Sequence, residues 1–340
     1  MLTLRPGAYR LLIRPLLFSV PPETAQRAAE TVLRLSLLWR GLSGALRVSN
    51  DRLRTDLSGL KLGNPVGLAA GYDKNCEFLP SLAALGFGYL TGGTVTRHPA
   101  SGNPKPRMLR YVKERSLINA LGFPSRGLNF AARRLERARE SLSGTPVVVS
   151  VSGITVDDIL TCHRRLEPFA EAIEINISSP NTEGLRVFLK PQALSELLGR
   201  VSDGRTKPLF VKLPPYASME AAHSPGSEAR DQVMGLVNAC LKHGVEALTV
   251  ANTKSAVDSR LAVGSGGLSG KLVFADMLTM VADIKAEVGD RAAINACGGI
   301  FSGEDAWEAL EAGATTVQLL TGLIYGGPGA VRQINQGLLR

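Results

Sequence analysis

The stretch that decides the fold runs from residue 209 to residue 251. It opens with Leu209-Phe210-Val211-Lys212-Leu213, a short run typical of a buried strand, and closes with a second such run at 247–251. Residues 229–243 lie between the two runs and repeat apolar positions at helical spacing. The order strand, helix, strand predicts a βαβ unit with two parallel strands.

The same alternation continues in both directions from this unit. Runs of buried-strand character span residues 66–70, 88–91, 147–151, 172–177, 209–213, 247–251, 292–296 and 316–320. Helical patterns fall between them, for instance at 77–85, 127–142, 192–201, 229–243, 272–288 and 303–312. Eight strands that alternate with helices predict an α/β fold, a closed (β/α)8 TIM barrel. An open doubly wound sheet is disfavoured because no Gly-x-Gly-x-x-Gly follows the first strand.

A short N-terminal helical extension precedes the barrel. The sequence predicts one helix over residues 9–19 and a second from about residue 23, after Pro21-Pro22, to residue 40, where Gly41 ends it. Residues 1–50 carry seven arginines against Glu23 and Glu30, so five of the nine net positive charges lie there. Amphipathicity alone leaves two possibilities open, a helix pair in a membrane interface and a helix pair packed on its own domain.

Composition excludes several classes of function. Aromatic residues make up only 5% of the chain, so we expect no stacking surface for nucleic acid. The four cysteines form no C-x-x-C pair and the four histidines form no metal-binding motif, so we expect no metal site. No stretch approaches 18 uninterrupted apolar residues, so no segment is expected to span a bilayer.

Polar residues collect after the expected strands, where α/β barrels bind their ligands. Lys212 lies inside a buried run, so its ammonium group needs a partner or a shifted pKa. Lys74 alone is more typical of a solvated loop, and Asn119 alone of a turn. Several asparagines near strand ends are harder to dismiss together, because planar amides complement the C=O and N–H edge of a pyrimidine-like ring. They are Asn119, Asn176, Asn181 and Asn252.

Two glycine clusters late in the chain predict a phosphate cup. Gly298-Gly299 follows the seventh expected strand and Thr321-Gly322 the eighth, where barrels commonly hold phosphate on backbone N–H groups. A barrel with such a cup, a buried lysine and no metal or nicotinamide fingerprint favours FMN as cofactor.

Four strings in this order resemble one family. Residues 64–74, 175–181, 266–270 and 297–300 are similar to dihydroorotate dehydrogenase, and the resemblance extends over about residues 58–338. That family consists of FMN-binding barrels that oxidise dihydroorotate to orotate in pyrimidine biosynthesis. The resemblance implies that Ser179 is the catalytic base, which removes the C5 proton while the C6 hydride passes to the flavin.

The resemblance also implies two sets of binding residues. The substrate set is Lys74, Asn119, Gly122, Phe123, Asn176, Asn181, Asn252 and Thr253, with Lys74 meeting the substrate carboxylate. The cofactor set is Ala70, Gly71, Thr94, Ser150, Asn176, Lys212, Ala251, Gly270, Gly299, Leu320 and Thr321, with Lys212 near the electron-rich end of the flavin ring. Thr182 and Phe123 match positions associated with the route of the proton.

A serine base together with a helical extension resembles the class 2 branch, which is membrane-associated and reduces quinone. The resemblance therefore implies two parts. Residues 1–45 are expected to form an arm that guides a membrane quinone and lies peripherally on the cytoplasmic side of the cell membrane. Residues 46–340 are expected to form an FMN-binding catalytic barrel. Arg110 matches a position linked to the quinone route. Four residues depart from the class 2 pattern, namely Gln26, Ser150, Ala251 and Leu320.

Three alternatives follow from these observations. A class 1-like dihydroorotate enzyme with a soluble acceptor fits the strings at 149–153 and 212–216. Another flavin barrel, such as a dihydropyrimidine or tRNA-dihydrouridine enzyme, is disfavoured by Lys74, because a neutral uracil ring has no carboxylate to pair with it. A non-catalytic barrel that binds phosphate or a membrane would leave the joint Asn, Ser and Lys set unexplained.

Overall fold

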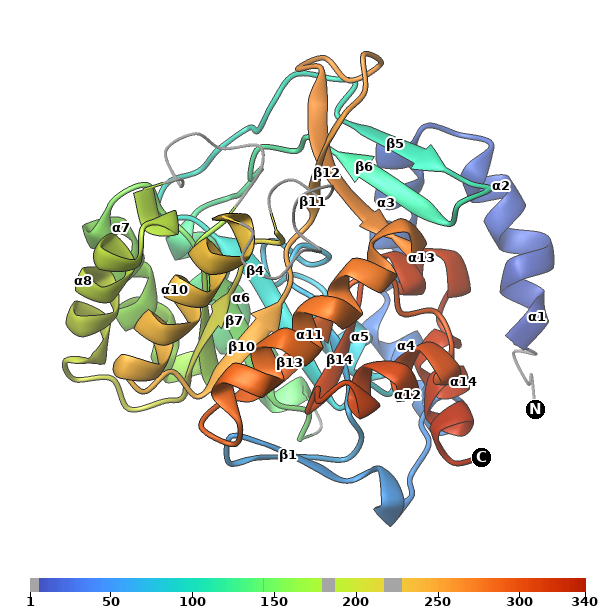
Figure 1. Ribbon diagram of the computed structural model, residues 1–340. Helices are drawn as coiled ribbons and strands as arrows, with labels where there is room; N and C mark the ends of the chain where they lie inside the picture. Colours follow the sequence, from blue (N-terminus) through green and yellow to red (C-terminus); the bar gives the residue numbers. More distant parts are fainter. Residues whose placement is uncertain (1–5, 143, 179–186, 217–227) are drawn as a thin grey trace.

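Eight parallel strands form a closed barrel (Figure 1). The computed structural model describes residues 6–142, 144–178, 187–216 and 228–340. Around the barrel the strands follow their order in the sequence: β3 (Val66–Leu68), β4 (Tyr89–Val95), β7 (Val147–Val151), β8 (Ala172–Asn176), β9 (Leu209–Lys212), β10 (Ala247–Val250), β13 (Ala293–Cys297) and β14 (Thr316–Leu319). Each of the eight predicted runs forms one of these strands, so the predicted TIM barrel is confirmed.

The last strand pairs with the first and closes the ring. Val317 faces Val66 and Leu319 faces Leu68 in a parallel register, and the Ala69 N–H donates to the Leu319 carbonyl at 2.9 Å. Gly67, between them, leaves room for the ring of Tyr89 on the neighbouring strand, because a Cβ at this position would overlap that ring. Closure therefore depends on a small residue beside a large one in adjacent strands.

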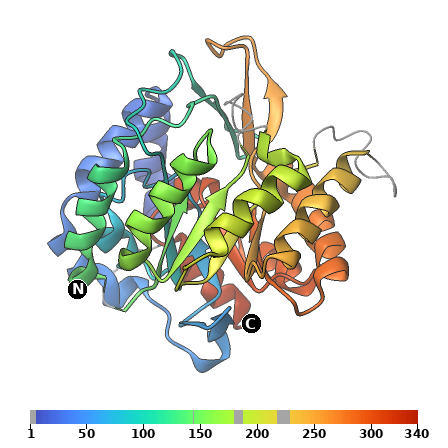
Figure 2. The same ribbon diagram turned by 90° about the vertical axis from the view of Figure 1, so that its left-hand side faces the viewer.

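Helices cover the outside of the barrel (Figures 1 and 2). They are α5 (Leu79–Ala83), α6 (Leu128–Ala138), α7 (Val156–Leu166), α8 (Pro191–Ser202), α10 (Glu228–Lys242), α11 (Phe274–Val288), α12 (Gly303–Glu311), α13 (Thr321–Gly326) and α14 (Ala330–Leu338). Short 3-10 turns occur at Asp51–Leu53, Arg139–Ser141, Glu167–Phe169 and Lys271–Val273. The six predicted barrel helices are present with shifted ends. The patterns did not single out α7, which begins where the Thr155 hydroxyl accepts the Asp158 N–H.

Two smaller sheets lie at opposite ends of the barrel (Figure 2). The hairpin of β1 (Thr55–Leu57) and β2 (Leu60–Leu62) lies at the end where the barrel strands begin, and Leu57 and Leu62 pack there against Tyr89 and Phe210. A four-stranded antiparallel sheet lies beyond the other end. Its strands are β5 (Met108–Tyr111), β6 (Ser116–Asn119), β11 (Lys254–Val257) and β12 (Ser265–Gly270).

The N-terminal helices, called the arm below, pack against the side of the barrel that carries α13 (Figure 1). One continuous helical segment comprises α1 (Pro6–Ala8), the π-turn Tyr9–Ile13 and α2 (Arg14–Phe18), and it is followed by α3 (Pro22–Leu33) and α4 (Ser36–Leu46). The predicted single helix over 23–40 is wrong. The chain leaves helical geometry at Leu35, and the Val32 carbonyl then accepts both the Leu35 backbone N–H and the Trp39 indole N–H. Gly41 lies inside α4 and does not end it.

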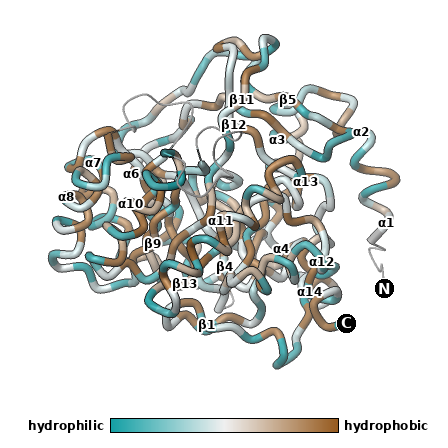
Figure 3. The backbone as a smooth tube through the Cα atoms, in the orientation of Figure 1, coloured by the Kyte–Doolittle hydropathy of each residue, from teal (hydrophilic) through white to brown (hydrophobic). Residues whose placement is uncertain are grey.

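The arm is held by core packing of Leu33, Trp39 and Leu46, by the Arg107–Glu23 ion pair, and by side chains that bond backbone carbonyls. The Tyr9 hydroxyl donates to the Ile324 carbonyl at 2.7 Å, and its ring lies over Gly327, where a Cβ would overlap it. Arg110 of β5 donates to the Val20 and Phe18 carbonyls at 2.7 and 3.3 Å, and its guanidinium lies 4.6 Å from the Phe18 ring centre. Arg110 therefore caps the last turn of α2. Hydrophobic residues recur along the arm helices in Figure 3.

We predict that Gly88→Ala destabilises the barrel. The added Cβ would overlap the backbone carbonyl oxygen of Asn64, whose side chain already bridges the Gly86 carbonyl and the Val66 N–H. Overpacking against backbone costs about 1–3 kcal/mol. Gly41→Ala is the matched control, because nothing lies within 4 Å of that Cβ and the helix should gain about 0.5–1 kcal/mol. Urea denaturation checks both, and equal midpoints for Gly88→Ala and the parent would contradict the prediction.

Candidate active site

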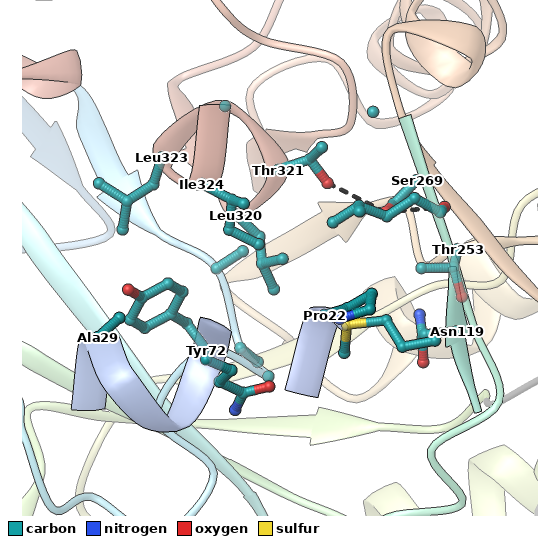
Figure 4. Close-up of a pocket in the computed structure, with 18 of the residues that line it drawn as sticks. Pro22, Ala29, Tyr72, Asn119, Thr253, Ser269, Leu320, Thr321, Leu323 and Ile324 are labelled. Atoms are coloured by element: carbon teal, nitrogen blue, oxygen red, sulfur yellow. Dashed lines mark hydrogen bonds between the residues drawn. The ribbon is translucent and has the colours of Figure 1, made fainter. Parts of the chain in front are cut away.

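One cavity of about 500 Å³ opens at the carboxyl ends of the barrel strands and extends to the arm. Figure 4 shows that two parts of the chain line it, with Asn119 and Thr253 from the barrel loops and sheet and with Pro22 and Ala29 from α3. We call it the site cavity. Because the arm forms one wall and the strand ends form another, the cavity joins two parts of the chain that lie far apart in the sequence.

Most of the residues expected from sequence line the site cavity. From the substrate set it is lined by Lys74, Asn119, Gly122, Phe123, Asn176, Asn252 and Thr253. From the cofactor set it is lined by Ala70, Gly71, Thr94, Lys212, Ala251, Gly270, Gly299, Leu320 and Thr321. Ser179, Asn181 and Thr182 lie outside the described residues. Ser150 does not line the cavity; it is buried behind Thr94, and the two hydroxyl oxygens are 3.0 Å apart.

Hydrogen bonds fix the orientation of the amide side chains on the cavity floor. Asn176 donates from Nδ2 to the Thr94 hydroxyl at 3.1 Å, and its Oδ1 accepts from Asn252 Nδ2 at 3.1 Å. Asn252 also donates to the hydroxyl of Ser178 at 3.1 Å, and Ser152 bonds the Asn176 carbonyl at 2.8 Å. These amides are therefore held in place before any ligand arrives, which lowers the entropy cost of positioning a planar ring.

Lys212 enters the cavity from inside the barrel. Its side chain is 6% exposed, and its nearest polar contact among the described residues is the Cys297 sulfur at 4.0 Å. No carboxylate of the described chain lies within ion-pair distance of its ammonium. A buried cation in this state favours an anionic or electron-rich ligand beside it.

A column of buried polar side chains fills the barrel below Lys212. Tyr89 shares a hydrogen bond with Thr316 at 2.8 Å, Thr316 donates to Asn295 at 2.7 Å, and Thr249 donates to Glu174 at 2.7 Å. One carboxylate oxygen of Glu174 has no hydrogen-bond partner among the described residues. Glu174 lies two residues before Asn176 on the same strand face, so its negative charge lies on the barrel axis below the cavity floor.

The loop after β3 holds Lys74. Its ammonium donates to the Gly71 carbonyl at 2.5 Å, and burial lowers its pKa, an effect that the charge of Glu30 partly offsets. The preceding Asp73 is 1% exposed, and its carboxylate accepts the N–H groups of Glu77 and Phe78 at 2.8 and 2.7 Å. Asp73 thus ties the Lys74 loop to the start of α5. Sequence reasoning missed it, because it stands in the same motif as the more conspicuous lysine.

The glycine cup forms where several backbone segments approach closely. A Cβ at Gly270 would meet the Arg115 carbonyl at 2.5 Å, and one at Gly299 would meet the Gly270 carbonyl at 3.0 Å. Gly270 and Gly299 also have φ angles of +99° and +73°, which favour glycine. Thr321 and Gly322 begin α13 beside them. Backbone segments therefore meet at the cup without side chains between them, an arrangement that would suit a phosphate group held by backbone N–H groups.

The loop at 119–125 covers part of the site cavity. Phe123 has φ +52°, a left-handed conformation that costs a non-glycine residue of order 1–3 kcal/mol. Neighbouring bonds hold it there: the Asn103 N–H donates to the Leu121 carbonyl at 3.0 Å, and Ala100 and Ser125 exchange two bonds at 2.9 Å. Asn119, at the base of this loop, donates to the Gly267 carbonyl at 3.2 Å.

The end of the cavity that faces the arm is mostly apolar. Leu17 and Ala29 of the arm lie across the cavity from Leu323 and Ile324 of α13. Figure 4 shows Ala29, Leu323 and Ile324. The polar residues contributed by the arm at this end are Tyr9, Gln26 and Glu30, and the barrel adds Tyr72 and Arg110. Of these, sequence reasoning named only Gln26 and Arg110 as relevant to the arm.

The chain is similar to proteins of one family. Residues 52–340 match the family described as dihydroorotate dehydrogenase. A Thermus thermophilus protein named dihydroorotate dehydrogenase (quinone) is 39% identical over 341 residues, 95% of this chain and 94% of that protein. A protein of the same name from Chloroflexus aurantiacus is 37% identical, and the match covers 97% of this chain and 96% of that protein. The crystal structure of DHODH from Eimeria tenella in complex with ferulenol has a TM-score of 0.77 at 30% identity, covering 91% and 90%.

We predict a pH-dependent stability difference between the parent and Asp73→Asn. Burial raises the pKa of Asp73 from 3.8 to about 6. A raised carboxyl pKa stabilises the fold fully below pH 3.8, and that contribution is lost as the pH rises through about 6. At every pH the variant should lose about 1 kcal/mol of unfolding free energy, because it forms one hydrogen bond fewer. As the pH rises from 3.8 to about 6, the parent should lose about 2–3 kcal/mol of unfolding free energy that the variant keeps. Chemical denaturation from pH 3.5 to 7.5 measures this, and a pH-independent difference would refute it.

Proposed function

The chain belongs to the dihydroorotate dehydrogenase family, and on that basis we propose that the site cavity binds FMN and dihydroorotate at its polar end and admits a quinone at its apolar end. The enzyme oxidises dihydroorotate to orotate in pyrimidine biosynthesis and passes the electrons to a quinone. The observation that carries the proposal is the single cavity, which connects the amide floor with an apolar space under the arm.

The alternatives from sequence are now distinguished by the relatives. The relatives are named dihydroorotate dehydrogenase (quinone) and match almost the whole chain at 35–39% identity. The alternative of a class 1-like enzyme with a soluble acceptor is therefore rejected. The departures Gln26, Ala251 and Leu320 line the site cavity without closing it. Ser150 supports Thr94 from behind.

FMN fits the residues at the polar end. We propose that Gly270, Gly299, Thr321 and Gly322 hold its phosphate, that Lys212 lies beside its ring, and that Thr94 and Asn176 bond the ring edge. When bound, FMN supplies a two-electron redox group that takes hydride from dihydroorotate and returns the electrons to the quinone. The close backbone approach in the cup and the buried ammonium of Lys212 without a carboxylate partner in the described chain support this assignment.

We assign the substrate to the remaining polar residues of the cavity. Lys74 would pair with the carboxylate of dihydroorotate, and Asn119, Asn176, Asn252 and Thr253 would bond its ring, with Gly122 and Phe123 as cover. Ser179, the proposed base, and Asn181 lie outside the described residues, so their roles rest on the sequence resemblance. A serine base needs a site that excludes water, and the arm and the 119–125 loop supply such a cover.

We further propose that the arm, within residues 1–45, lies on a membrane surface while the barrel, residues 46–340, remains outside it. Leu11 and Leu16 of the arm are 76% and 73% exposed, and Leu12 and Leu37 are also exposed. Arginines alternate with them along the arm, which suits the interface of an anionic membrane. No helix among the described residues is long and apolar enough to cross a bilayer. The cytoplasmic side of the cell membrane is the proposed location.

The function is tested by following the flavin anaerobically. We expect a yellow protein that releases FMN on denaturation, bleaches when dihydroorotate is added and recovers when a quinone is added. Ser179→Ala should keep its flavin but bleach at least about a hundredfold more slowly, because general base catalysis contributes about 10²–10⁴-fold. Absence of bleaching in the parent would refute the substrate. Recovery with fumarate or a nicotinamide but not with quinone would refute the acceptor alone, and an unchanged bleaching rate in Ser179→Ala would remove that residue from its role.

Membrane association is tested by sedimentation with vesicles that contain an anionic phospholipid. The double variant Leu11→Ser and Leu16→Ser should bind at least about tenfold more weakly, because burying a leucine side chain contributes about 1.5–3 kcal/mol. Val257→Ser is the matched control, since Val257 is 86% exposed on β11, away from the arm. Similar losses in both variants would show that binding does not run through the arm.

A further inference from the structure

A chain of hydrogen bonds runs through the inside of the barrel, from the floor of the site cavity to a buried carboxylate. Its six side chains are at most 3% exposed, and consecutive members are 2.7–3.4 Å apart. In order from the cavity they are Gln318, Tyr89, Thr316, Asn295, Thr249 and Glu174. Because Gln318 lines the cavity, the chain connects the cavity floor with the negative charge of Glu174.

The donors of this chain all point toward Glu174. The Thr316 hydroxyl donates to Asn295, so Tyr89 supplies the hydrogen between Tyr89 and Thr316. The Thr249 hydroxyl accepts from the Asn295 amide at 3.4 Å and donates to Glu174 at 2.7 Å. Glu174 is therefore the final acceptor, which favours its ionised, acceptor-only form.

The carboxylate of Glu174 lies near Lys212 without being paired with it. Thr249 connects the two, because it pairs with Lys212 in the register of β9 and β10 while its hydroxyl bonds Glu174. Glu174 itself pairs with Phe210, two residues before Lys212 on the same strand face. Among the described residues the two charged groups form no ion pair. Two opposite charges therefore lie inside the barrel, one at the cavity and one below it.

Both charges act on the cavity floor. Cys297 lines the cavity, and its sulfur lies 4.0 Å from Lys212 Nζ. Burial raises the pKa of the Cys297 thiol, while the charge of Lys212 lowers it and the charge of Glu174 raises it. Charges in a barrel interior that excludes water are screened much less than charges at the surface. A ligand beside Lys212 and Cys297 would therefore experience the two charges in opposition.

The sparse hydrogen bonding of Glu174 is difficult to explain by packing. One of its carboxylate oxygens has no partner among the described residues, and Thr249 donates the printed bond to the other. A buried carboxylate with so few partners is costly, and an amide of the same shape would cost less. An amide would also accept the Thr249 hydroxyl. What glutamate adds at this position is its charge.

We propose that Glu174 lowers the reduction potential of the flavin by opposing the charge of Lys212. This inference rests on the proposed function, because it requires FMN at the polar end of the cavity with Lys212 beside its ring. Negative charge develops at the pyrimidine end of a flavin ring on reduction, so a nearby cation favours the reduced form and a nearby anion favours the oxidised form. Lys212 thus helps the site to accept electrons, and Glu174 helps it to release them.

The test compares how tightly oxidised and reduced FMN bind to the full chain. Glu174→Gln keeps the length of the side chain and an acceptor for Thr249 but removes the charge. Reduced FMN should bind this variant about tenfold more tightly than the parent, and oxidised FMN should bind within about threefold of the parent. For a two-electron couple a tenfold change raises the potential by about 30 mV. Titration of the flavin-loaded protein against a dye of known potential measures the shift without dihydroorotate or quinone.

Two further variants separate the charge from the packing. Glu174→Met is a second neutral variant with different hydrogen bonding, and it should shift the potential in the same direction. Thr316→Val is the matched control, because it interrupts the same hydrogen-bond chain and leaves every charge in place. Its ratio of reduced to oxidised affinity should stay within about twofold of the parent.

The inference is overturned if both neutral variants keep the potential of the parent. It is also overturned if they weaken both forms of FMN alike, or if Thr316→Val shifts the potential as far as they do, because Glu174 would then act through packing. A parent that holds flavin but is not bleached by dihydroorotate counts against the proposed function alone. A parent that binds no FMN refutes both.

Discussion

Barrel closure between β14 and β3 is the contact on which the site depends. The register of Val317 with Val66 and of Leu319 with Leu68 joins residues about 250 positions apart in the chain. It brings the Lys74 loop, which follows β3, next to the Leu320-Thr321 turn, which follows β14, so that the Leu320 side chain lies 3.5 Å from where a Cβ of Gly71 would be. Without this pairing the Lys74 loop and the glycine cup would lie at separate edges of an open sheet. With it they form adjacent parts of one cavity wall.

Local pattern was sufficient for the parts of the fold that repeat locally. The eight barrel strands are short apolar runs between turns, and the polar residues at their ends could be assigned to one rim from topology alone. The four-stranded sheet escaped the same reasoning. Its central pairing joins Gly267 to Asn119, and strand β11 alternates between partly buried and exposed residues without an apolar run. Such strands owe their stability to distant partners, which local periodicity does not reveal.

The arm shows a second limit of sequence reasoning. Apolar residues recur at helical spacing from α3 into α4, so the sequence predicted one helix. In the structure a turn separates the two helices, and the hydrogen bond from the Trp39 indole to the Val32 carbonyl stabilises it. The same limit applied to the site. Tyr72 and Glu30 are ordinary residues in their own segments, and only the docking of α3 against the β3 loop brings them into one cavity. Residues that line a cavity only because distant segments pack together carry no local signal.

The way the arm is held explains how it can present apolar surface on two sides. Its specific contacts run from Tyr9, Arg110 and Ser81 to backbone carbonyls, and these satisfy helix ends that would otherwise be unpaired. Leu33, Trp39 and Leu46 of the arm pack into the core, and other arm positions remain apolar on two further faces. Leu17 and Ala29 face the cavity, while Leu11 and Leu16 face outward. The arm therefore presents two apolar faces, which would suit the proposed quinone on the cavity side and the proposed membrane surface on the outer side.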